Sequence, residues 1–119
     1  MRLHTALHLW AGVFEEQYNV RAVAGVVKSD SAYLVFKHEL AHEIIENALE
    51  HAKKDVDKGL EVETFEDEVR QGFRWCRVGS YSPIPCGGLH VRNTSEIGEL
   101  VCTQATTEDR KQKLTLRAK

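Results

Sequence analysis

Two short segments near opposite ends of the chain each carry a pair of potential metal ligands. His4 and His8 form the first pair, and Cys86 and His90 form the second, with the members of each pair four positions apart. Imidazole nitrogen and thiolate sulfur suit Zn²⁺, which has four such ligands in structural sites and an open position in catalytic ones. One ion bound by all four residues would require the start of the chain to pack against residues 86–90. The two pairs therefore constrain the fold more strongly than any other feature of the sequence.

The second pair is the more specific of the two. His4 and His8 lie one turn apart on a predicted helix, so they face the same way, but a lone pair of this kind is more often ordinary core or surface histidine. In the segment Cys-Gly-Gly-Leu-His, residues 86–90, two glycines separate the ligands. Glycine permits positive φ and close backbone approach, as a loop that folds back tightly requires. Taken together, the four residues favour a metal site.

The hydrophobic pattern predicts an α+β fold. Residues 3–18 and 39–54 each show an apolar stripe at helical spacing. Strands are predicted over residues 20–27, 33–36, 60–63, 73–78, 97–103 and 114–117, with a short helix over residues 64–68 and a polar turn over residues 106–111. Because helices and strands do not alternate regularly, we expect a largely antiparallel sheet packed against two main helices. The zinc site would lie between the first helix and a loop before the last strands.

Length and composition predict a single domain, residues 1–119, with one modest core. Hydrophobic residues make up 42% of the chain and charged residues 29%, which is typical of soluble globular proteins. No apolar run is long enough to span a bilayer, and the start of the chain lacks the layout of a signal peptide, so we expect a cytoplasmic protein without a membrane partner. Cys76, Cys86 and Cys102 are too few for a disulfide scaffold, and reduced thiols are expected. We expect Cys76 and Cys102 to be buried, and Phe65 and Phe73 to belong to the core.

The charge is distributed unevenly along the chain. Residues 38–68 hold eleven Asp or Glu against three Lys or Arg, whereas residues 69–119 hold nine Lys or Arg against four Asp or Glu. A phosphate backbone would be attracted to the second half and repelled by the first. A solvated surface with uneven charge explains the distribution equally well, so charge alone does not predict a nucleic-acid partner.

A second metal motif competes with the first. Residues 38–42 read His-Glu-Leu-Ala-His on a predicted helix, which matches the zincin metalloprotease pattern with Glu39 as general base. A glutamate-rich helix produces this short pattern by chance, and no metzincin extension follows it. A protease that uses His38, Glu39 and His42 is therefore the less favoured alternative.

Around both ligand pairs the sequence resembles the editing domain of alanyl-tRNA synthetase. Residues 4–9, His-Thr-Ala-Leu-His-Leu, look like the family segment HTAxHL, and residues 86–98 look like CGGTHVxxTxEIG. The chain is most similar to the free-standing AlaX proteins, which are trans-editing factors, and we expect a short form without the extra domain of larger members. Leu89 stands where the family commonly has Thr.

This resemblance implies a Zn²⁺ ion bound by His4, His8, Cys86 and His90. It also implies hydrolysis of the ester in tRNA(Ala) wrongly charged with serine, or with glycine. A zinc ion lowers the pKa of bound water and polarises a carbonyl, which suits this reaction.

Three further residues are expected to contact the substrate. Backbone N–H groups of Gly87 and Gly88 would stabilise the developing negative charge. Thr5 would hydrogen-bond the serine hydroxyl, a partner that an alanyl ester lacks. The alternative is a closed zinc site that only holds the fold together, in which case the chain would be a non-catalytic RNA-binding or interaction module.

Overall fold

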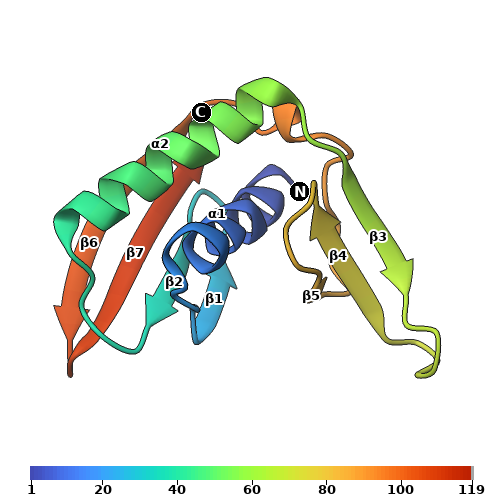
Figure 1. The fold of residues 1–119 in the computed structure, drawn as a ribbon, viewed down its shortest axis with the longest axis horizontal. Coiled ribbons are helices and arrows are strands. Elements are labelled where there is room, and N and C mark those ends of the chain that lie inside the picture. The colour runs from blue at the N-terminus through green and yellow to red at the C-terminus, as the bar shows by residue number, and fades with distance from the viewer. Residues whose placement is uncertain (119) are drawn as a thin grey trace.

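The protein, described over residues 1–118 in a computed structural model, combines two α-helices with two antiparallel sheets (Figure 1). Helix α1 spans Arg2–Tyr18 and helix α2 spans His42–Lys58. The first sheet has the order β1 (Ala24–Val27), β2 (Ala32–Phe36), β7 (Lys111–Ala118) and β6 (Leu100–Glu108). The second has the order β3 (Val62–Glu66), β4 (Arg74–Val78) and β5 (Ile84–Pro85), and a short 3₁₀ helix, η1, spans Thr94–Glu96. The predicted α+β class and antiparallel pairing are confirmed.

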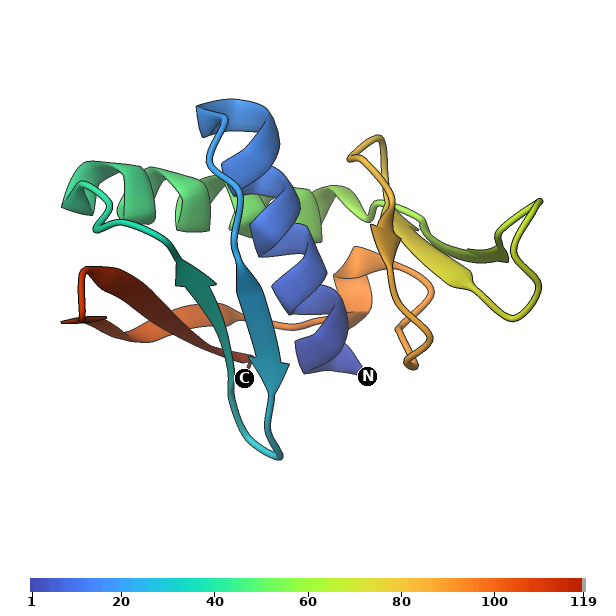
Figure 2. The ribbon, with the colours of Figure 1, turned by 90° about the horizontal axis from the view of Figure 1, so that it is seen from below.

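Helix α1 lies between the two sheets and contacts both (Figures 1 and 2). Its apolar side chains at helical spacing are buried, and Trp10 and Phe14 are among the largest fully buried residues of the core. The helix ends at Asn19, which adopts the left-handed conformation that asparagine tolerates. Within residues 1–118, neither helix has the length and apolar character needed to cross a membrane.

The four-stranded sheet buries one face beneath the helices. Side chains on β2 alternate between buried and half-buried, with Leu34 and Phe36 in the core, and Leu114 and Leu116 continue that face on β7. Helix α2 lies across β6 and β7 (Figure 1). The core therefore forms between one sheet face and both helices, as the sequence predicts.

The three-stranded sheet projects to one side (Figure 2). The short helix predicted over residues 64–68 is wrong, because Val62–Glu66 pairs with β4 instead. The Asp67 carboxylate then accepts hydrogen bonds from the N–H groups of Val69 and Arg70, which closes a turn after the strand. Phe65 and Phe73 are only half-buried, so their predicted place in the core is also wrong.

Helix α2 begins at His42 rather than near residue 39, and it continues to Lys58. The N–H of Leu40 donates to Oε1 of Gln112 on β7 at 2.9 Å, and Ala41 is extended as the N-cap. His38 and Glu39 therefore precede the helix, and His38 does not share a helical face with His42. The prediction that residues 38–42 lie on a helix, as a zincin motif requires, is therefore wrong.

Strands β6 and β7 form a longer hairpin than predicted. Residues 97–99 precede β6, which begins at Leu100, and the polar turn expected over residues 106–111 is mostly strand. Only Asp109 and Arg110 form the turn, with φ of 50° and 69°. Two positive φ values in succession match the turn type that favours tight hairpins. The outer half of β6 is exposed, so it carries polar residues that resemble a loop in the sequence.

Helix η1 is held against the end of α2. Asn93 and Glu96 form a capping box, and Nδ2 of Asn93 donates to the carbonyl of Gly59 at 2.9 Å. The buried hydroxyl of Thr94 donates to the carbonyl of Asp55 at 2.8 Å and accepts from the N–H of Leu60 at 2.8 Å. These bonds fix η1 on the end of α2 and on the turn that follows it.

The loop before residue 86 is fixed by a buried tyrosine. The Tyr81 hydroxyl donates to the carboxylate of Asp55 on α2, and both residues are buried. Burial raises the pKa of Tyr81, and the Asp55 carboxylate raises it further. A Cβ at Gly12 would lie 3.0 Å from Cγ of Tyr81, so the tyrosine ring packs directly on α1.

Replacing Tyr81 with Phe is expected to lower the free energy of unfolding by about 1.5–3 kcal/mol, because a buried carboxylate loses its hydroxyl donor. Urea unfolding followed by circular dichroism measures this change. Tyr33→Phe is the matched control, since no hydrogen bond of its hydroxyl is found within residues 1–118, and it should change the free energy by less than about 0.5 kcal/mol. Equal effects of the two variants would contradict the prediction.

Candidate metal centre

The four predicted ligands meet in one cluster. Each of His4, His8, Cys86 and His90 offers a ligand atom, and these atoms all lie within 4.8 Å of one another. The first two come from one side of α1, and the others from the loop after β5. The rings of His4 and His90 stack with centroids 4.1 Å apart. Among the described residues 1–118, no other group of three or more His, Cys, Asp or Glu forms such a cluster.

The chemistry of the cluster fits a metal ion. Nδ1 of His8 and Nε2 of His90 are buried without a hydrogen-bond partner. Buried polar atoms without a partner are rare in native proteins and call for an explanation such as an ion. The Cys86 sulfur lies 3.1 Å from Nε2 of His4. Three imidazoles and one thiol thus face one another with atoms that are available to bind a metal ion.

The backbone of the loop orients His4. Nδ1 of His4 lies 3.2 Å from the carbonyl oxygen of Leu89. Because a carbonyl only accepts, Nδ1 carries the hydrogen, and Nε2 is left with its lone pair toward Cys86. The Leu89 side chain is 75% exposed. Its contact with His4 therefore comes from the main chain, which a residue other than Thr supplies equally well.

Burial keeps the histidines neutral. Burial, together with the charge of the neighbouring imidazoles, lowers the pKa of His8 to about 3 and that of His90 to about 4. Burial also lowers the pKa of His4, while its hydrogen bond to Leu89 acts in the opposite direction. Near pH 7 all three rings are therefore uncharged and have a lone pair available for a metal.

The two glycines of the loop differ in their surroundings. A Cβ at Gly88 would overlap the His4 ring, and its distance from Nδ1 would be 2.8 Å, whereas a Cβ at Gly87 would meet nothing within 4 Å. The close approach predicted for this loop is confirmed at Gly88. Neither glycine has a positive φ, so the loop uses the small size of glycine and not its left-handed backbone conformation. The N–H of Gly88 donates to the Cys86 sulfur at 3.4 Å, and the substrate contacts of both glycines stay predictions.

Thr5 lies behind the cluster and is fully buried. Its hydroxyl donates to the carbonyl of Met1 at 3.1 Å and accepts from the N–H of Val91 at 3.0 Å. Nδ1 of His90 lies 3.0 Å from the same oxygen. The predicted contact with a serine hydroxyl stays a prediction, and it would have to replace one of these bonds.

A cavity of about 690 Å³ opens beside the cluster. His4, His8 and Cys86 line one part of it, and it follows α1 as far as Glu15, between walls formed by β1 and β5. The stretch from residue 4 to residue 15 corresponds to about 16 Å of helix. Trp75, which the sequence places near the loop, lines the cavity as well. The ligands are therefore accessible to a small molecule or to the end of a larger one.

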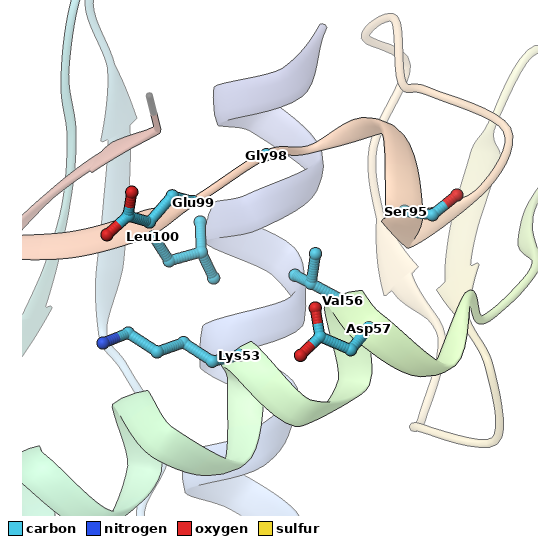
Figure 3. Close-up of a pocket in the computed structure, with 7 residues that line it drawn as sticks. All are labelled: Lys53, Val56, Asp57, Ser95, Gly98, Glu99 and Leu100. Carbon is cyan, nitrogen blue, oxygen red and sulfur yellow. The ribbon is translucent and has the colours of Figure 1, made fainter.

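A second cavity, of about 460 Å³, lies between α2 and residues 95–100 (Figure 3). Lys53 and Asp57 border it from α2, and Glu99 borders it from the opposite side. It shares no lining residue with the metal cluster, and none of its lining residues is His or Cys. The cavity along α1 is therefore the one that belongs to the site.

Sequence reasoning missed the residues that support the site. The spacing Asn93-x-x-Glu96 is a readable capping-box signal, and it would have predicted the anchor after residue 90. The bond between Tyr81 and Asp55 joins residues 26 positions apart and leaves no local pattern. The carbonyl of Leu89 is a backbone group, so side-chain identity does not reveal its role.

Gly88→Ala is expected to weaken metal binding at least about tenfold, because the new methyl group displaces the His4 ring. Gly87→Ala is the matched control and should change the affinity by less than about twofold, since its methyl group faces open space. Titration with Zn²⁺ or Co²⁺ against a competing chelator measures both affinities. Equal affinities of the two variants would contradict the close packing at Gly88.

The metal-free protein should lose stability as the pH falls. An unperturbed histidine has a pKa of 6.5, whereas the pKa is about 3 for His8 and about 4 for His90 in the fold, so the unfolded chain binds more protons between about pH 4 and 6.5. The free energy of unfolding therefore decreases as the pH is lowered through that window. With chelator present, we expect Tm to be lower at pH 5 than at pH 7.5 by at least about 4 °C.

His8→Gln should make this pH dependence weaker, whereas exposed His38→Gln should leave it unchanged. Differential scanning fluorimetry across the pH range compares the three proteins. A metal-free wild type with the same Tm at both pH values would contradict the prediction.

Comparison with known proteins shows what the chain is similar to. Residues 73–117 match the family model described as threonyl and alanyl tRNA synthetase second additional domain. The chain is 32% identical over 104 residues to alanyl-tRNA editing protein AlaX-M of Pyrococcus horikoshii, which covers 84% of this chain and 47% of that protein. It is 24% identical over 114 residues to AlaX-L of the same organism, covering 82% of this chain and 28% of that protein.

A third relative is an alanine–tRNA ligase from Alkaliphilus metalliredigens, 40% identical over 62 residues, which covers 52% of this chain and 7% of the ligase. The chain thus spans less than half the length of these relatives. The matched domain includes Cys86 and His90, and the alignments with the AlaX proteins cover most of the chain. The chain therefore contains the second additional domain of threonyl and alanyl tRNA synthetases and is homologous to the AlaX alanyl-tRNA editing proteins.

Proposed function

We propose that the chain is a zinc-dependent hydrolase that removes the amino acid from mischarged tRNA(Ala). Serine is the favoured acyl group and glycine the second. The observation that carries the proposal is the cluster of His4, His8, Cys86 and His90 at the edge of a cavity. The homology with proteins named for alanyl-tRNA editing supports the choice of substrate.

The donor set favours zinc among the common ions. Three imidazoles and one thiolate are ligands that Zn²⁺ accepts, whereas Mg²⁺ and Ca²⁺ prefer oxygen. In a tetrahedral zinc site the bonds of 2.0–2.3 Å place neighbouring ligand atoms about 3.3–3.7 Å apart. The ligand atoms here lie within 4.8 Å of one another, so a small contraction would bring them to the spacing at which residues bind one Zn²⁺ ion.

The proposed reaction needs a positioned ester and a donor for the developing negative charge. Bound Zn²⁺ supplies a Lewis acid and a water of lowered pKa. The cavity along α1 would hold the aminoacyl end of the tRNA beside His8 and Cys86 and shield it from bulk water. The N–H of Gly87 forms no hydrogen bond within residues 1–118, and it is our candidate for donating to the oxyanion. The N–H of Gly88 donates to the Cys86 sulfur instead, so this N–H is less available to the substrate.

The alternative is a closed metal site in a non-catalytic RNA-binding or interaction module. Four protein ligands fit such a site as well. The cavity favours catalysis, because a site that only holds the fold together does not need ligands at the wall of a 690 Å³ space. A protease using His38, Glu39 and His42 is not favoured, since the first two precede the helix and Nε2 of His42 lies 2.9 Å from Glu46.

Two further expectations accompany this function. We propose that residues 1–119 act as one editing domain and that mischarged tRNA(Ala) is met in the cytoplasm.

We expect the wild-type protein to deacylate Ser-tRNA(Ala) and to leave Ala-tRNA(Ala) largely intact. Cys86→Ala should lower the rate at least about 100-fold, because one of the four ligands is lost. His42→Ala is the control and should retain metal and activity, since this exposed histidine lies outside the cluster. Release of radiolabelled serine measures the rate.

The metal content of each protein is measured alongside the rate. Metal-loaded wild type without activity on Ser-tRNA(Ala) or Gly-tRNA(Ala) would favour the non-catalytic module. Loss of metal in His42→Ala, with metal retained in Cys86→Ala, would overturn the assignment of the site.

A further inference from the structure

The hydroxyl of Thr5 on helix α1 contacts two consecutive residues, His90 and Val91, of the loop that follows β5. Thr5 has 0% of its surface exposed, although it lies between two of the proposed ligands in the sequence. Its oxygen lies 3.1 Å from the carbonyl of Met1, 3.0 Å from the N–H of Val91 and 3.0 Å from Nδ1 of His90. A hydroxyl has one hydrogen to donate and two lone pairs to accept with, so three partners use its full capacity.

The partners decide where each hydrogen lies. The Met1 carbonyl only accepts, so it takes the hydroxyl hydrogen, and the Val91 N–H only donates, so it occupies one lone pair. The second lone pair faces Nδ1 of His90 and is satisfied only when that nitrogen carries a hydrogen. In a neutral imidazole the other nitrogen then carries no hydrogen and has a lone pair available.

The bare nitrogen of His90 is the one that faces the cluster. Nε2 of His90 is buried and has no hydrogen-bond partner. His4 shows the same arrangement, with Nδ1 held by the carbonyl of Leu89 and Nε2 toward the Cys86 sulfur. Two of the three histidines thus have their tautomer set by an acceptor outside the cluster.

We propose that Thr5 is a positioning residue whose hydroxyl keeps the hydrogen of His90 on Nδ1 and so presents Nε2 to the metal ion. The inference rests on the metal site of the proposed function, but not on the reaction or its substrate. Partners of this kind fix the orientation of a metal-binding histidine and raise its basicity, and their loss typically lowers metal affinity 10–100-fold. The role differs from contact with a serine hydroxyl, because the oxygen of Thr5 has no capacity left for substrate.

Thr94 provides a matched control. It is also 0% exposed, and its hydroxyl also joins two backbone groups, the carbonyl of Asp55 and the N–H of Leu60. It does not touch the metal cluster. Thr94→Val therefore removes an equally buried hydroxyl from an equally constrained position and reports the effect of lost stability alone.

The experiment compares Thr5→Val, Thr5→Ser and Thr94→Val in the full 119-residue chain. Metal affinity is measured by titration with Zn²⁺ and Co²⁺ under conditions in which circular dichroism shows the metal-free protein to be folded. We expect Thr5→Val to bind about 10–100-fold more weakly and Thr5→Ser to stay within about threefold, because serine keeps the hydroxyl. Thr94→Val should lose thermal stability but keep the wild-type affinity.

The tautomer of His90 is measured separately in the metal-free wild type, by long-range ¹H–¹⁵N correlation near pH 7.5. A hydrogen on Nδ1 supports the proposal, and a hydrogen on Nε2 overturns it without any variant, even if Thr5→Val fails to fold. Wild-type affinity in Thr5→Val, or an equal loss in Thr94→Val, would also overturn it.

Deacylation assays of the same proteins keep the two proposals apart. Normal metal affinity with a lost preference for Ser-tRNA(Ala) in Thr5→Val would assign Thr5 to substrate and overturn the positioning role. An inactive wild type with the expected tautomer and affinities would leave the positioning role standing and remove the hydrolase.

Discussion

The packing of the first helix against the loop at residues 86–90 is the contact on which the rest of the structure depends. Cys86 and His4 touch although they are 82 positions apart in the chain. The loop is held on both sides by helix α2: Tyr81 binds Asp55 before it, and the capping box around Asn93 is bonded to Gly59 after it. One face of the cluster therefore comes from α1, and the position of the other is determined by α2.

The sequence predicts the four residues of the cluster because their signals are local. Two histidines one turn apart and a Cys-Gly-Gly-x-His loop can be recognised without knowing their neighbours, and both helices follow from their apolar stripes. The secondary-structure predictions are wrong where a residue distant in the sequence determines the local structure. Gln112 binds the N–H of Leu40 and sets the start of α2, which removes His38 from that helix. Where a helix is expected over residues 64–68, residues 64–66 are instead part of β3, because β4 lies beside them.

The supporting contacts of the site are less predictable than its ligands for the same reason. The hydrogen on His4 is placed by a main-chain carbonyl at residue 89, and Thr5 meets His90 across 85 positions of sequence. Neither contact has a characteristic spacing. A resemblance to a family can point to Thr5, but only the fold reveals that its hydroxyl faces His90. Only the fold distinguishes Gly88, where a methyl group would overlap the His4 ring, from Gly87, where it would meet nothing within 4 Å.

The separation of the two ligand pairs along the chain also has a consequence for synthesis. A growing chain presents His4 and His8 about 80 residues before Cys86, so the first helix can form early while its metal partners do not yet exist. Closing so long a loop is slow relative to local structure. An ion captured only by the first pair would be weakly held, and stable capture must wait for the loop that α2 holds in place. Metal uptake would therefore follow, rather than guide, the assembly of the surrounding core.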